Sequence, residues 1–406
     1  MKKILFLQIY GGGEITGGTE VYLKNLLKEL SKISSKNNYF VTTFNKNDSI
    51  FSPYARVEDS NFTRFLENWK TVTLSYKFPL LGFFNYLWGI YWLYKISCKI
   101  IAQEKIDLIY SNGGNLTAIV AFLLYKKYKV PYILHFHGLF NFQKQLNANT
   151  FSWRSLLFKK ITKNSFLQAT RLIANSKEVA DDINSIEGID KKAEVINCFT
   201  DTDVFFPQNQ QDCRKKLKLH YDQFIFLSSN RLDRNKGIDS LMQAIPLVKN
   251  NNITFIFIGD GELKTQIVNL AKHDKRIKYF PPINNETLST YNGAADIVWG
   301  AASTHYIGLS IIEALACGRP IMALKTPLPA DNDYQSLVDP NTIPSSVGYL
   351  VDANPLSFVK LLEQLIEHRD ILETKTENCL KFYHQQYGSK NINKIMKILY
   401  NVVQSS

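Results

Sequence analysis

The chain has 406 residues, of which 45% are hydrophobic and 21% charged, a composition that is ordinary for a globular enzyme of two or three domains. The five cysteines are odd in number and form no Cys-x-x-Cys pair, which argues against a disulfide framework and a zinc site and suits a reducing cytosol. Most of the net charge of +12 lies in residues 1–197, where 26 Lys and Arg face 15 Asp and Glu, whereas residues 198–406 hold 22 against 21. The first half therefore predicts an anionic partner, either nucleic acid or a membrane surface.

The first half predicts an α/β unit in which strands and helices alternate. Lys2 and Lys3 precede a short apolar run, but Gln8 interrupts it, so we interpret residues 3–8 as a strand rather than a signal peptide. A glycine-rich loop at residues 11–18 leads into a helix and lacks the Gly-x-Gly-x-x-Gly dinucleotide pattern. Residues 45–77 are polar and irregular and resemble an insertion. Further strands are expected at residues 39–43, 108–110, 132–136, 171–174 and 194–196.

Residues 78–94 form an uncharged stretch that admits two interpretations. Its 17 residues are fewer than the roughly 20 needed to span a bilayer, so a buried core helix is one possibility. Trp88 and Trp92, with lysines on both sides of the stretch, also fit a helix that lies in the plane of a membrane surface. Because this stretch is in the basic half, it favours a membrane surface over nucleic acid as the anionic partner.

A histidine, His137, directly follows the strand expected at residues 132–136. Ligands of open α/β sheets bind at the carboxyl ends of the strands, so His137 is a candidate site residue, although a structural hydrogen bond would also explain it. Ser176 is expected to cap the helix that runs to Ile183.

Residues 197–222 read as an interdomain linker that contains the pattern Asp201-x-Asp203. A second such pattern is Asp331-x-Asp333. Asp-x-Asp binds a metal-diphosphate in some transferases, but chance and helix capping explain so short a pattern more often, and we expect no metal.

The second half predicts another α/β unit, with strands at 224–229, 253–258, 277–280, 297–299, 321–324 and 348–351. Arg231 and Lys236 bracket a loop that ends at the start of a helix expected from Ile238 to about Lys249. Two cations at a helix N-terminus suit a diphosphate, although a solvated basic loop is the alternative.

The helix expected at residues 309–317 is apolar nearly all round, with Glu313 in its middle and Gly318 and Pro320 ending it. A carboxylate in such a helix is costly unless something hydrogen-bonds to it. An internal cap or salt bridge and a ligand hydroxyl are both possible partners for Glu313.

Taken in order, these motifs resemble those of the family four glycosyltransferases, which are retaining enzymes with the GT-B fold. The resemblance covers nearly the whole chain and rests on the segments 17–20, 137–138, 174–176, 201–207, 231–237, 259–261 and 308–318. It implies an α/β fold of two Rossmann-like, doubly wound domains that face each other across a cleft. Residues 1–197 would bind the acceptor, with a helix at 388–406 packing back on them, and residues 198–387 would bind a nucleotide-sugar donor.

The resemblance also implies roles for individual residues. Arg231 and Lys236 would neutralise the leaving diphosphate, Glu313 would hold the ribose of the nucleotide, and His137 would line the sugar and acceptor side. These four are the expected catalytic residues. The expected donor-binding residues are Gly17, Gly18, Asn230, Gly259, Ile283, His305, Ile307, Gly308, Leu309 and Ser310. No metal or other cofactor is expected.

The sequence departs from the family pattern at a few positions near the expected donor site. His305 stands where the first Glu of the family's Glu-x7-Glu motif usually contacts the donor sugar, and Tyr306 and Ile307 replace the usual Gly-Phe. Phe199 and Asn230 stand at positions that usually hold glycine. The choice of sugar is therefore the property that these departures affect most.

The expected function is transfer of a hexose from a nucleotide-sugar to a lipid-linked or polysaccharide acceptor, in the synthesis of lipopolysaccharide or capsule. The expected location is the cytoplasmic face of a bacterial cell membrane, with the anionic membrane surface, and not nucleic acid, as a partner. A nucleotide-sugar epimerase or phosphorylase of the same fold is an alternative. A non-catalytic protein that binds sugar nucleotides is another, motivated by His305.

Overall fold

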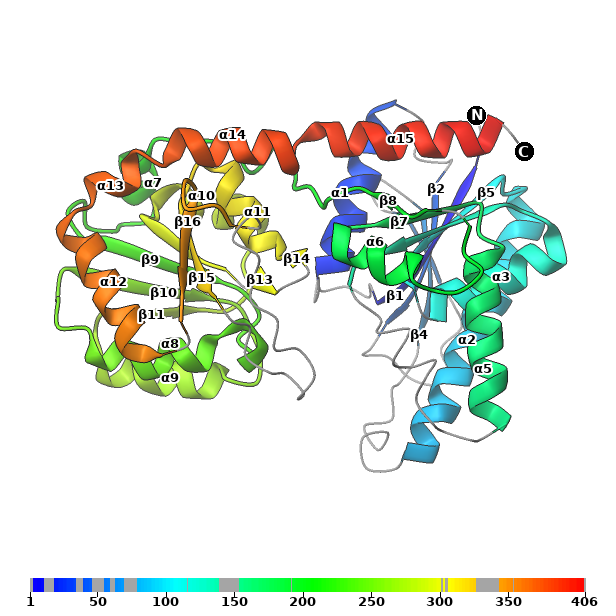
Figure 1. The fold of residues 1–406 in the computed structure, drawn as a ribbon, viewed down its shortest axis with the longest axis horizontal. Coiled ribbons are helices and arrows are strands. Elements are labelled where there is room, and N and C mark those ends of the chain that lie inside the picture. The colour runs from blue at the N-terminus through cyan, green and yellow to red at the C-terminus, as the bar shows by residue number, and fades with distance from the viewer. Residues whose placement is uncertain are drawn as a thin grey trace. The chain divides into compact units, whose positions relative to one another are not determined.

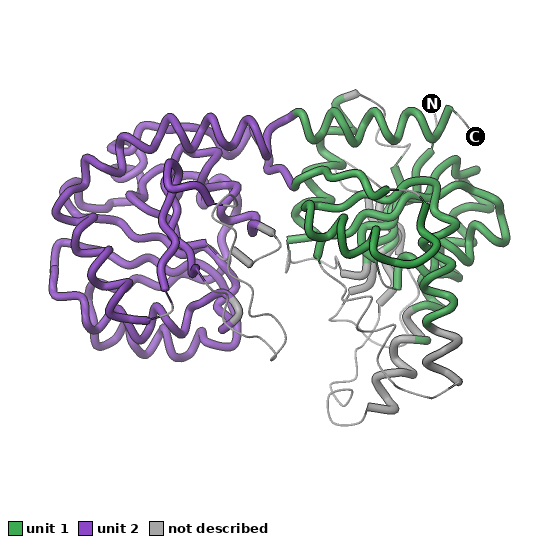
Figure 2. Tube along the Cα trace, in the orientation of Figure 1, with its two compact units in different colours: residues 1–197, 390–406 green, residues 198–389 purple. Residues whose placement is uncertain are grey.

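The computed structural model divides into two compact units, residues 1–197 with 390–406 (unit 1) and residues 198–389 (unit 2), coloured separately in Figure 2. The residues that the structure describes are 3–10, 18–33, 39–45, 55–58, 63–68, 79–114, 116–138, 153–190, 192–300, 302–303, 306–325, 343–352 and 354–404.

Unit 1 is built on an eight-stranded sheet with the strand order β3-β4-β2-β1-β5-β6-β7-β8 (Figure 1). Neighbouring strands run parallel except β3 and β4, which pair antiparallel. The strands are β1 (Ile4–Tyr10), β2 (Tyr39–Asn45), β3 (Ala55–Glu58), β4 (Thr63–Asn68), β5 (Leu108–Asn112), β6 (Tyr132–Phe136), β7 (Arg171–Ala174) and β8 (Glu194–Val195). β5 and β6 are buried along their whole length, as central strands of a covered parallel sheet should be.

The helices of unit 1 cover this sheet and supply much of its apolar core. They are α1 (Gly18–Ile33), α2 (Pro79–Glu104), α3 (Leu116–Tyr128), α5 (Trp153–Leu167), α6 (Lys177–Asn184) and α15 (Ser389–Gln404). α3 is apolar nearly all round because it packs against α2 and α5 as well as the sheet. α6 begins at its predicted cap, where the Ser176 hydroxyl accepts a hydrogen bond from the Val179 N–H.

One prediction for unit 1 needs correction. The segment 45–77 was expected to be irregular, but it contains β3 and β4, and β4 pairs parallel to β2. These strands are short and partly polar, so backbone pairing, of β3 with β4 and of β4 with β2, rather than an apolar alternation, makes them strands. The uncharged stretch at 78–94 is part of a longer helix, α2, which continues to Glu104. Among the helices that the structure describes, none is both long enough and apolar enough to cross a membrane.

Unit 2 contains a six-stranded parallel sheet with the order β11-β10-β9-β12-β15-β16. The strands, β9 (Phe224–Ser229), β10 (Ile253–Ile258), β11 (Ile277–Phe280), β12 (Ile297–Trp299), β15 (Ile321–Leu324) and β16 (Gly348–Val351), have the predicted bounds. A short hairpin, β13 (Ala302–Ser303) with β14 (Tyr306–Ile307), lies in the segment that was expected to be a plain loop.

The helices of unit 2 lie on both faces of its sheet (Figure 1). They are α7 (Gln210–Lys216), η3 (Arg234–Lys236), α8 (Ile238–Ala244), η4 (Ile245–Leu247), α9 (Lys264–His273), α10 (Asn285–Ala294), α11 (Leu309–Ala316), α12 (Pro355–Glu367), α13 (Asp370–Glu373) and α14 (Thr376–Gln386). The helix expected to run to Lys249 was predicted too long: Pro246, inside η4, lacks the N–H that would continue α8. After α11 the chain turns at Gly318, whose φ of 72° confirms the predicted glycine stop.

Candidate functional site

The candidate site of unit 2 begins where three parallel strands end side by side. Ser229 of β9 lies opposite Ile258 of β10, and Ser228 lies opposite Trp299 of β12. The loops that follow these strands therefore start at the same edge of the sheet, where ligands of open α/β sheets bind. α11 begins in the chain just after β12 and its hairpin, so its N-terminus belongs to this loop region.

Asn230 joins these loops through both ends of its side chain. Its Nδ2 donates to the Trp299 carbonyl at 2.9 Å, and its Oδ1 accepts from the Ser310 hydroxyl in the first turn of α11 at 2.6 Å. Gly259 lies close by, with φ of 149°, and a Cβ there would be 2.1 Å from the Asn230 carbonyl oxygen. Three of the predicted donor-binding residues, Asn230, Gly259 and Ser310, are thus brought together.

The loop that carries the two predicted cations has a fixed backbone. The indole N–H of Trp299 donates to the Lys236 carbonyl at 2.9 Å, and Gly237, with φ of 68°, leaves no room for a side chain against Leu324. The Arg231 guanidinium is exposed and forms an ion pair with Asp233. Lys236 is half-buried at the end of η3, just before α8. The loop therefore holds two cationic side chains on a rigid turn.

The N-terminus of α11 has no side-chain cap, because Gly308 occupies the capping position. The N–H groups of a helix's first turn lack partners within the helix, so those of Leu309 and Ser310 can bind an anion. The Ile307 side chain is buried in the apolar core of unit 2, and the Ile283 side chain is partly buried against that core. Two predicted donor-binding residues, Gly17 and His305, lie outside the described residues, and Gly18 is the first residue of α1.

Glu313 is a buried carboxyl group in the second turn of α11. Only 6% of the residue is exposed, and no other described residue forms a hydrogen bond or ion pair with its carboxyl group. Burial raises the pKa of Glu313 to about 8, so the group is mostly protonated at neutral pH. The internal cap or salt bridge considered from the sequence is thus absent from the described part of the chain. A buried polar group without a partner calls for an explanation, and a bound ligand would supply one.

Unit 1 has its own cluster of polar side chains at the carboxyl ends of β1, β5 and β6. The Nε2 atom of His137 lies 2.6 Å from Oδ1 of Asn112. The Nδ2 atom of Asn112 donates to the Gln8 side-chain oxygen at 2.5 Å and to the Thr19 carbonyl at 3.0 Å. Sequence reasoning singled out His137 but missed Asn112 and Gln8, which lie 104 positions apart and meet only through the register of β1 with β5.

The environment of His137 keeps its imidazole ring neutral. Its ring lies 4.2 Å from that of His135 and 4.7 Å from that of Tyr22, centroid to centroid. Burial lowers the pKa of His137 to about 3, and it holds the pKa of His135 well below its usual value. A neutral imidazole offers one donor and one acceptor, so His137 suits hydrogen bonds to hydroxyl groups.

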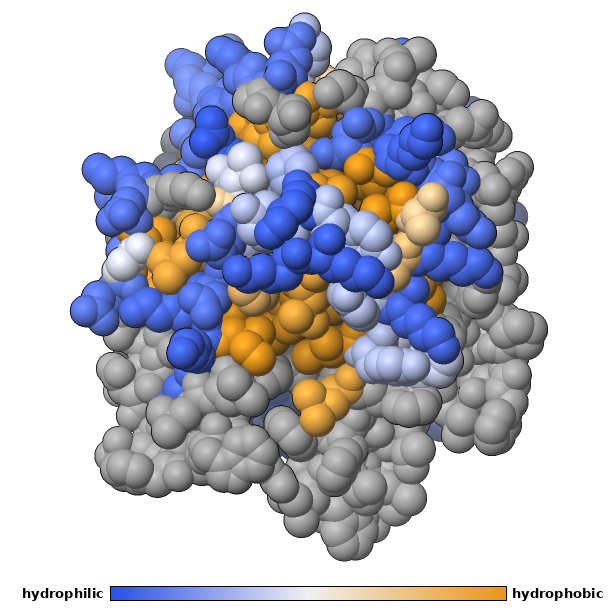
Figure 3. Space-filling model, turned by 90° about the vertical axis from the view of Figure 1, so that its right-hand side faces the viewer, coloured by the Kyte–Doolittle hydropathy of each residue, from blue (hydrophilic) through white to orange (hydrophobic). Residues whose placement is uncertain are grey.

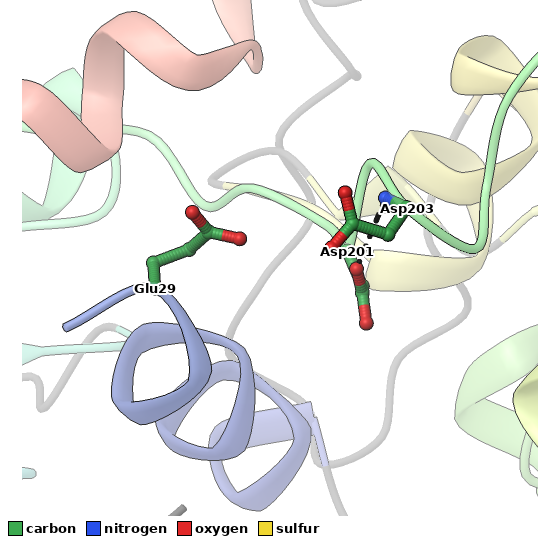
Figure 4. A group of neighbouring side chains, drawn as sticks. All are labelled: Glu29, Asp201 and Asp203. Carbon is green, nitrogen blue, oxygen red and sulfur yellow. Dashed lines mark hydrogen bonds between the residues drawn. The ribbon is translucent and has the colours of Figure 1, made fainter. Parts of the chain in front are cut away.

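The carboxylates of the Asp201-x-Asp203 pattern lie on the turn that opens unit 2 (Figure 4). Oδ1 of Asp201 accepts a hydrogen bond from the Asp203 N–H at 3.1 Å, and the Asp201 carbonyl accepts from the Phe205 N–H at 2.8 Å. Asp201 therefore stabilises this turn through its own side chain and carbonyl. Glu29, on α1 of unit 1, pairs with Lys32 on its own helix, with 2.8 Å between Oε1 and Nζ.

Comparison with known families accounts for both halves of the chain. A family model described as Glycosyltransferase Family 4 matches residues 16–204, and one described as Glycosyl transferases group 1 matches residues 209–383. The chain belongs to the family four glycosyltransferases. The predicted family is thereby confirmed, and so is the GT-B fold, which this glycosyltransferase shares with its structural neighbours.

Two sequence relatives show how far the similarity extends. D-inositol 3-phosphate glycosyltransferase 1 of Catenulispora acidiphila is 28% identical over 170 residues, which cover 38% of this chain. The match spans only 41% of that relative's length. An uncharacterized glycosyltransferase of Methanocaldococcus jannaschii is 23% identical over 399 residues, covering 98% of this chain and 97% of the relative.

Solved structures share the fold over the whole chain. Sucrose-phosphate synthase from Thermosynechococcus elongatus has a TM-score of 0.76 at 18% identity, with 100% of each chain covered. Anabaena HepE in complex with UDP-glucose has a TM-score of 0.68 at 19% identity, covering 99% of this chain and 100% of the other. At these identities the likeness concerns the fold.

Proposed function

We propose that this glycosyltransferase is a retaining, metal-independent hexosyltransferase that uses a nucleotide-sugar donor. Its acceptor is a lipid-linked or polysaccharide chain in cell-surface polysaccharide synthesis, at the inner face of the cell membrane. The observation that carries the donor assignment is the buried carboxyl group of Glu313 in the helix whose uncapped N-terminus lies among the loops that carry Arg231 and Lys236. Such a site offers a hydrogen-bonding group for ribose hydroxyls and positive charge for a diphosphate.

The proposed chemistry places the positive charge where the reaction needs it. The bond between the anomeric carbon and the diphosphate oxygen breaks ahead of attack, and its electron pair stays on the diphosphate. The acceptor hydroxyl then bonds to the anomeric carbon from the same face and passes its proton to that diphosphate oxygen. Because negative charge grows on the diphosphate in the transition state, Arg231, Lys236 and the start of α11 would stabilise it more than the ground state.

The proposed metal independence rests on the same cationic loop and helix N-terminus. The two cations and the helix N-terminus supply the charge that a divalent ion supplies in other transferases. We expect transfer to proceed at an unchanged rate after treatment with EDTA.

The proposed acceptor and membrane location rest on the α2–α3 face of unit 1. Lysine ammonium groups lie over aromatic rings there, with Lys95 4.7 Å from the Trp92 ring centroid and Lys127 5.0 Å from that of Tyr128. Figure 3 shows apolar surface between hydrophilic side chains on a face of unit 1. Basic side chains beside interfacial aromatics suit an anionic membrane surface, which would bring the enzyme to a lipid-linked acceptor.

The donor assignment is tested by substituting its cations. A thermal-shift panel of nucleotides and nucleotide-sugars, with UDP-glucose as the first donor, should identify the ligand that raises the unfolding temperature. With that donor, Arg231→Ala and Lys236→Ala should each lower kcat by about 100-fold, the scale of a lost oxyanion stabiliser. Arg234→Ala is the matched control, because Arg234 is an exposed cation of the same loop.

Each alternative function predicts a different result. Normal donor use by the Arg231→Ala enzyme would contradict the donor site. Conversion of the donor into an epimeric nucleotide-sugar without an acceptor would show an epimerase, and pyridoxal phosphate absorbance would show a phosphorylase. Donor binding without turnover across a broad acceptor panel would show a non-catalytic binding protein.

A further inference from the structure

The polar cluster of unit 1 contains a chain of hydrogen bonds whose donors and acceptors can be assigned. Its members are Gln8 in the second half of β1, Asn112 at the end of β5 and His137 just after β6. Gln8 and Asn112 are buried, with only 4% and 3% of each residue exposed. The imidazole of His137, which is half-buried, is hydrogen-bonded to this buried pair through Asn112.

The Thr19 carbonyl determines how the Asn112 carboxamide is turned. A carbonyl oxygen can only accept, so the carboxamide nitrogen of Asn112 must be the atom 3.0 Å from it. The carboxamide oxygen then faces His137, and it too can only accept. The proton between the two side chains, 2.6 Å apart, therefore belongs to Nε2 of His137.

The second ring nitrogen of His137 is left as an acceptor. A charged imidazole is disfavoured here, because the half-buried ring lies 4.2 Å from the ring of buried His135, centroid to centroid. A neutral ring with its proton on Nε2 has an unprotonated Nδ1. This nitrogen has no hydrogen-bond partner among the described residues, and His137 as a whole is half-buried rather than buried.

We propose that Asn112 is a positioning residue that fixes His137 as the Nε2–H tautomer, so that Nδ1 accepts a hydrogen bond from a sugar hydroxyl. The inference rests on the proposed function, in which His137 lines the sugar side of the site. It goes beyond that function by naming the residue that determines which ring nitrogen of His137 carries the proton. The ligand atom at Nδ1 must be a donor, so a hydroxyl is accepted there, whereas a carbonyl oxygen or an ether is rejected.

The tautomer is read directly by NMR in the ligand-free protein. In ¹⁵N-histidine-labelled protein, long-range ¹H–¹⁵N correlation shows which ring nitrogen carries the proton, and His137→Gln identifies the His137 signal among seven histidines. We expect protonated Nε2 and unprotonated Nδ1 in the parent, and a changed or averaged pattern in Asn112→Leu. Protonated Nδ1 in the parent, or an unchanged pattern in Asn112→Leu, would overturn the proposal.

A double-mutant cycle separates positioning from a general effect on folding. Asn112→Leu should lower kcat/KM by roughly 10- to 100-fold, as outer-shell substitutions do, but should cost little further once His137 is alanine. Asn112→Asp retains an acceptor for Nε2–H and should recover part of the loss. Additive losses in the cycle would overturn the proposal.

Ser111→Ala is the matched control. Ser111 precedes Asn112 in β5 and is also buried, but its hydroxyl donates to the Gly113 carbonyl rather than to His137. Because the NMR result needs neither donor nor turnover, failure of the proposed function would leave the tautomer assignment separately testable.

Discussion

Glu313 is the residue whose protonation should respond most to a bound nucleotide. In the ligand-free protein, burial raises the pKa of its carboxyl group to about 8. Ribose hydroxyls that donate to the carboxylate would favour the ionised form and lower that pKa. Binding would therefore release a proton at pH 7, and nucleotide affinity would rise as the pH increases from about 6 to 8. Calorimetric titration in buffers of different ionisation enthalpy measures the released proton.

Glu313→Gln provides the control, because it keeps the shape of the side chain and removes its titration. Proton release should disappear in this variant, and proton uptake by the parent would contradict the ribose assignment.

The stability of the ligand-free protein gives a second check on the titration of Glu313. From pH 4.5 to about 8 the folded state keeps a proton that the unfolded state has lost, so this group's contribution to stability falls as the pH rises. The Gln variant should lack that fall.

The residues that sequence reasoning found differ in kind from those it missed. Glu313 was visible because a carboxyl group interrupts an apolar helix, and His137 because it follows a buried strand. Asn112 and Gln8 carry no such local signal. They meet because the register of β1 with β5 brings them together, just as helix placement brings the predicted residues Ser310 and Asn230 into contact. Contacts of this kind follow from the tertiary structure and not from any one segment.

At the scale of elements, the α2–α3 face carries the membrane prediction. Lys95 on α2, Lys126 and Lys127 on α3 and Lys129 just after it are all exposed. Each lysine near an anionic surface contributes about 1 kcal/mol, so replacing all four by glutamine should weaken binding to phosphatidylserine vesicles by roughly 100-fold or more. Vesicle co-sedimentation at low and high salt measures this loss.

A matched variant separates the effect of the α2–α3 face on vesicle binding from the effect of net charge. Lys215, Lys216, Lys272 and Lys275 are exposed lysines of unit 2, and their replacement by glutamine changes the charge equally. Equal weakening by both variants, or no binding by the parent, would remove the membrane assignment. Tryptophan substitution is a poorer test, because Trp92 is half-buried against the core of unit 1 and its loss would also destabilise the fold.

The elements that the sequence predicted well are those with a buried apolar run. All six strands of the parallel sheet in unit 2 have the predicted bounds, because each is a short apolar run between polar turns. β3 and β4 were missed because they are strands through their pairing with each other and with β2. The end of α8 was missed because the prediction followed the helical spacing of apolar residues past Pro246, which ends the helix.

At the scale of the whole molecule, the chain returns to unit 1 only at its last helix. Residues 390–406 belong to unit 1, and the buried residues of α15 include Ile392, Ile395, Leu399 and Val402. Burial of four such side chains is worth on the order of 6–12 kcal/mol before conformational entropy is subtracted. That is comparable to the net stability of a whole domain, so α15 should decide whether unit 1 stays folded.

Ile395→Asp tests this dependence, because Ile395 is fully buried and a carboxylate at that position would lose its solvation. Hydrogen exchange measured by mass spectrometry should show faster exchange in β1, β5 and β6, while β9, β10 and β12 keep their protection. Tyr400→Asp is the control on the same helix, since Tyr400 is 62% exposed and should tolerate the charge. Equal loss of protection in both sheets would mean that the two units unfold together, and unchanged protection in β1, β5 and β6 would mean that unit 1 does not depend on α15. Faster exchange confined to unit 1 would show that the last helix stabilises the unit that holds His137 independently of the unit that holds Glu313.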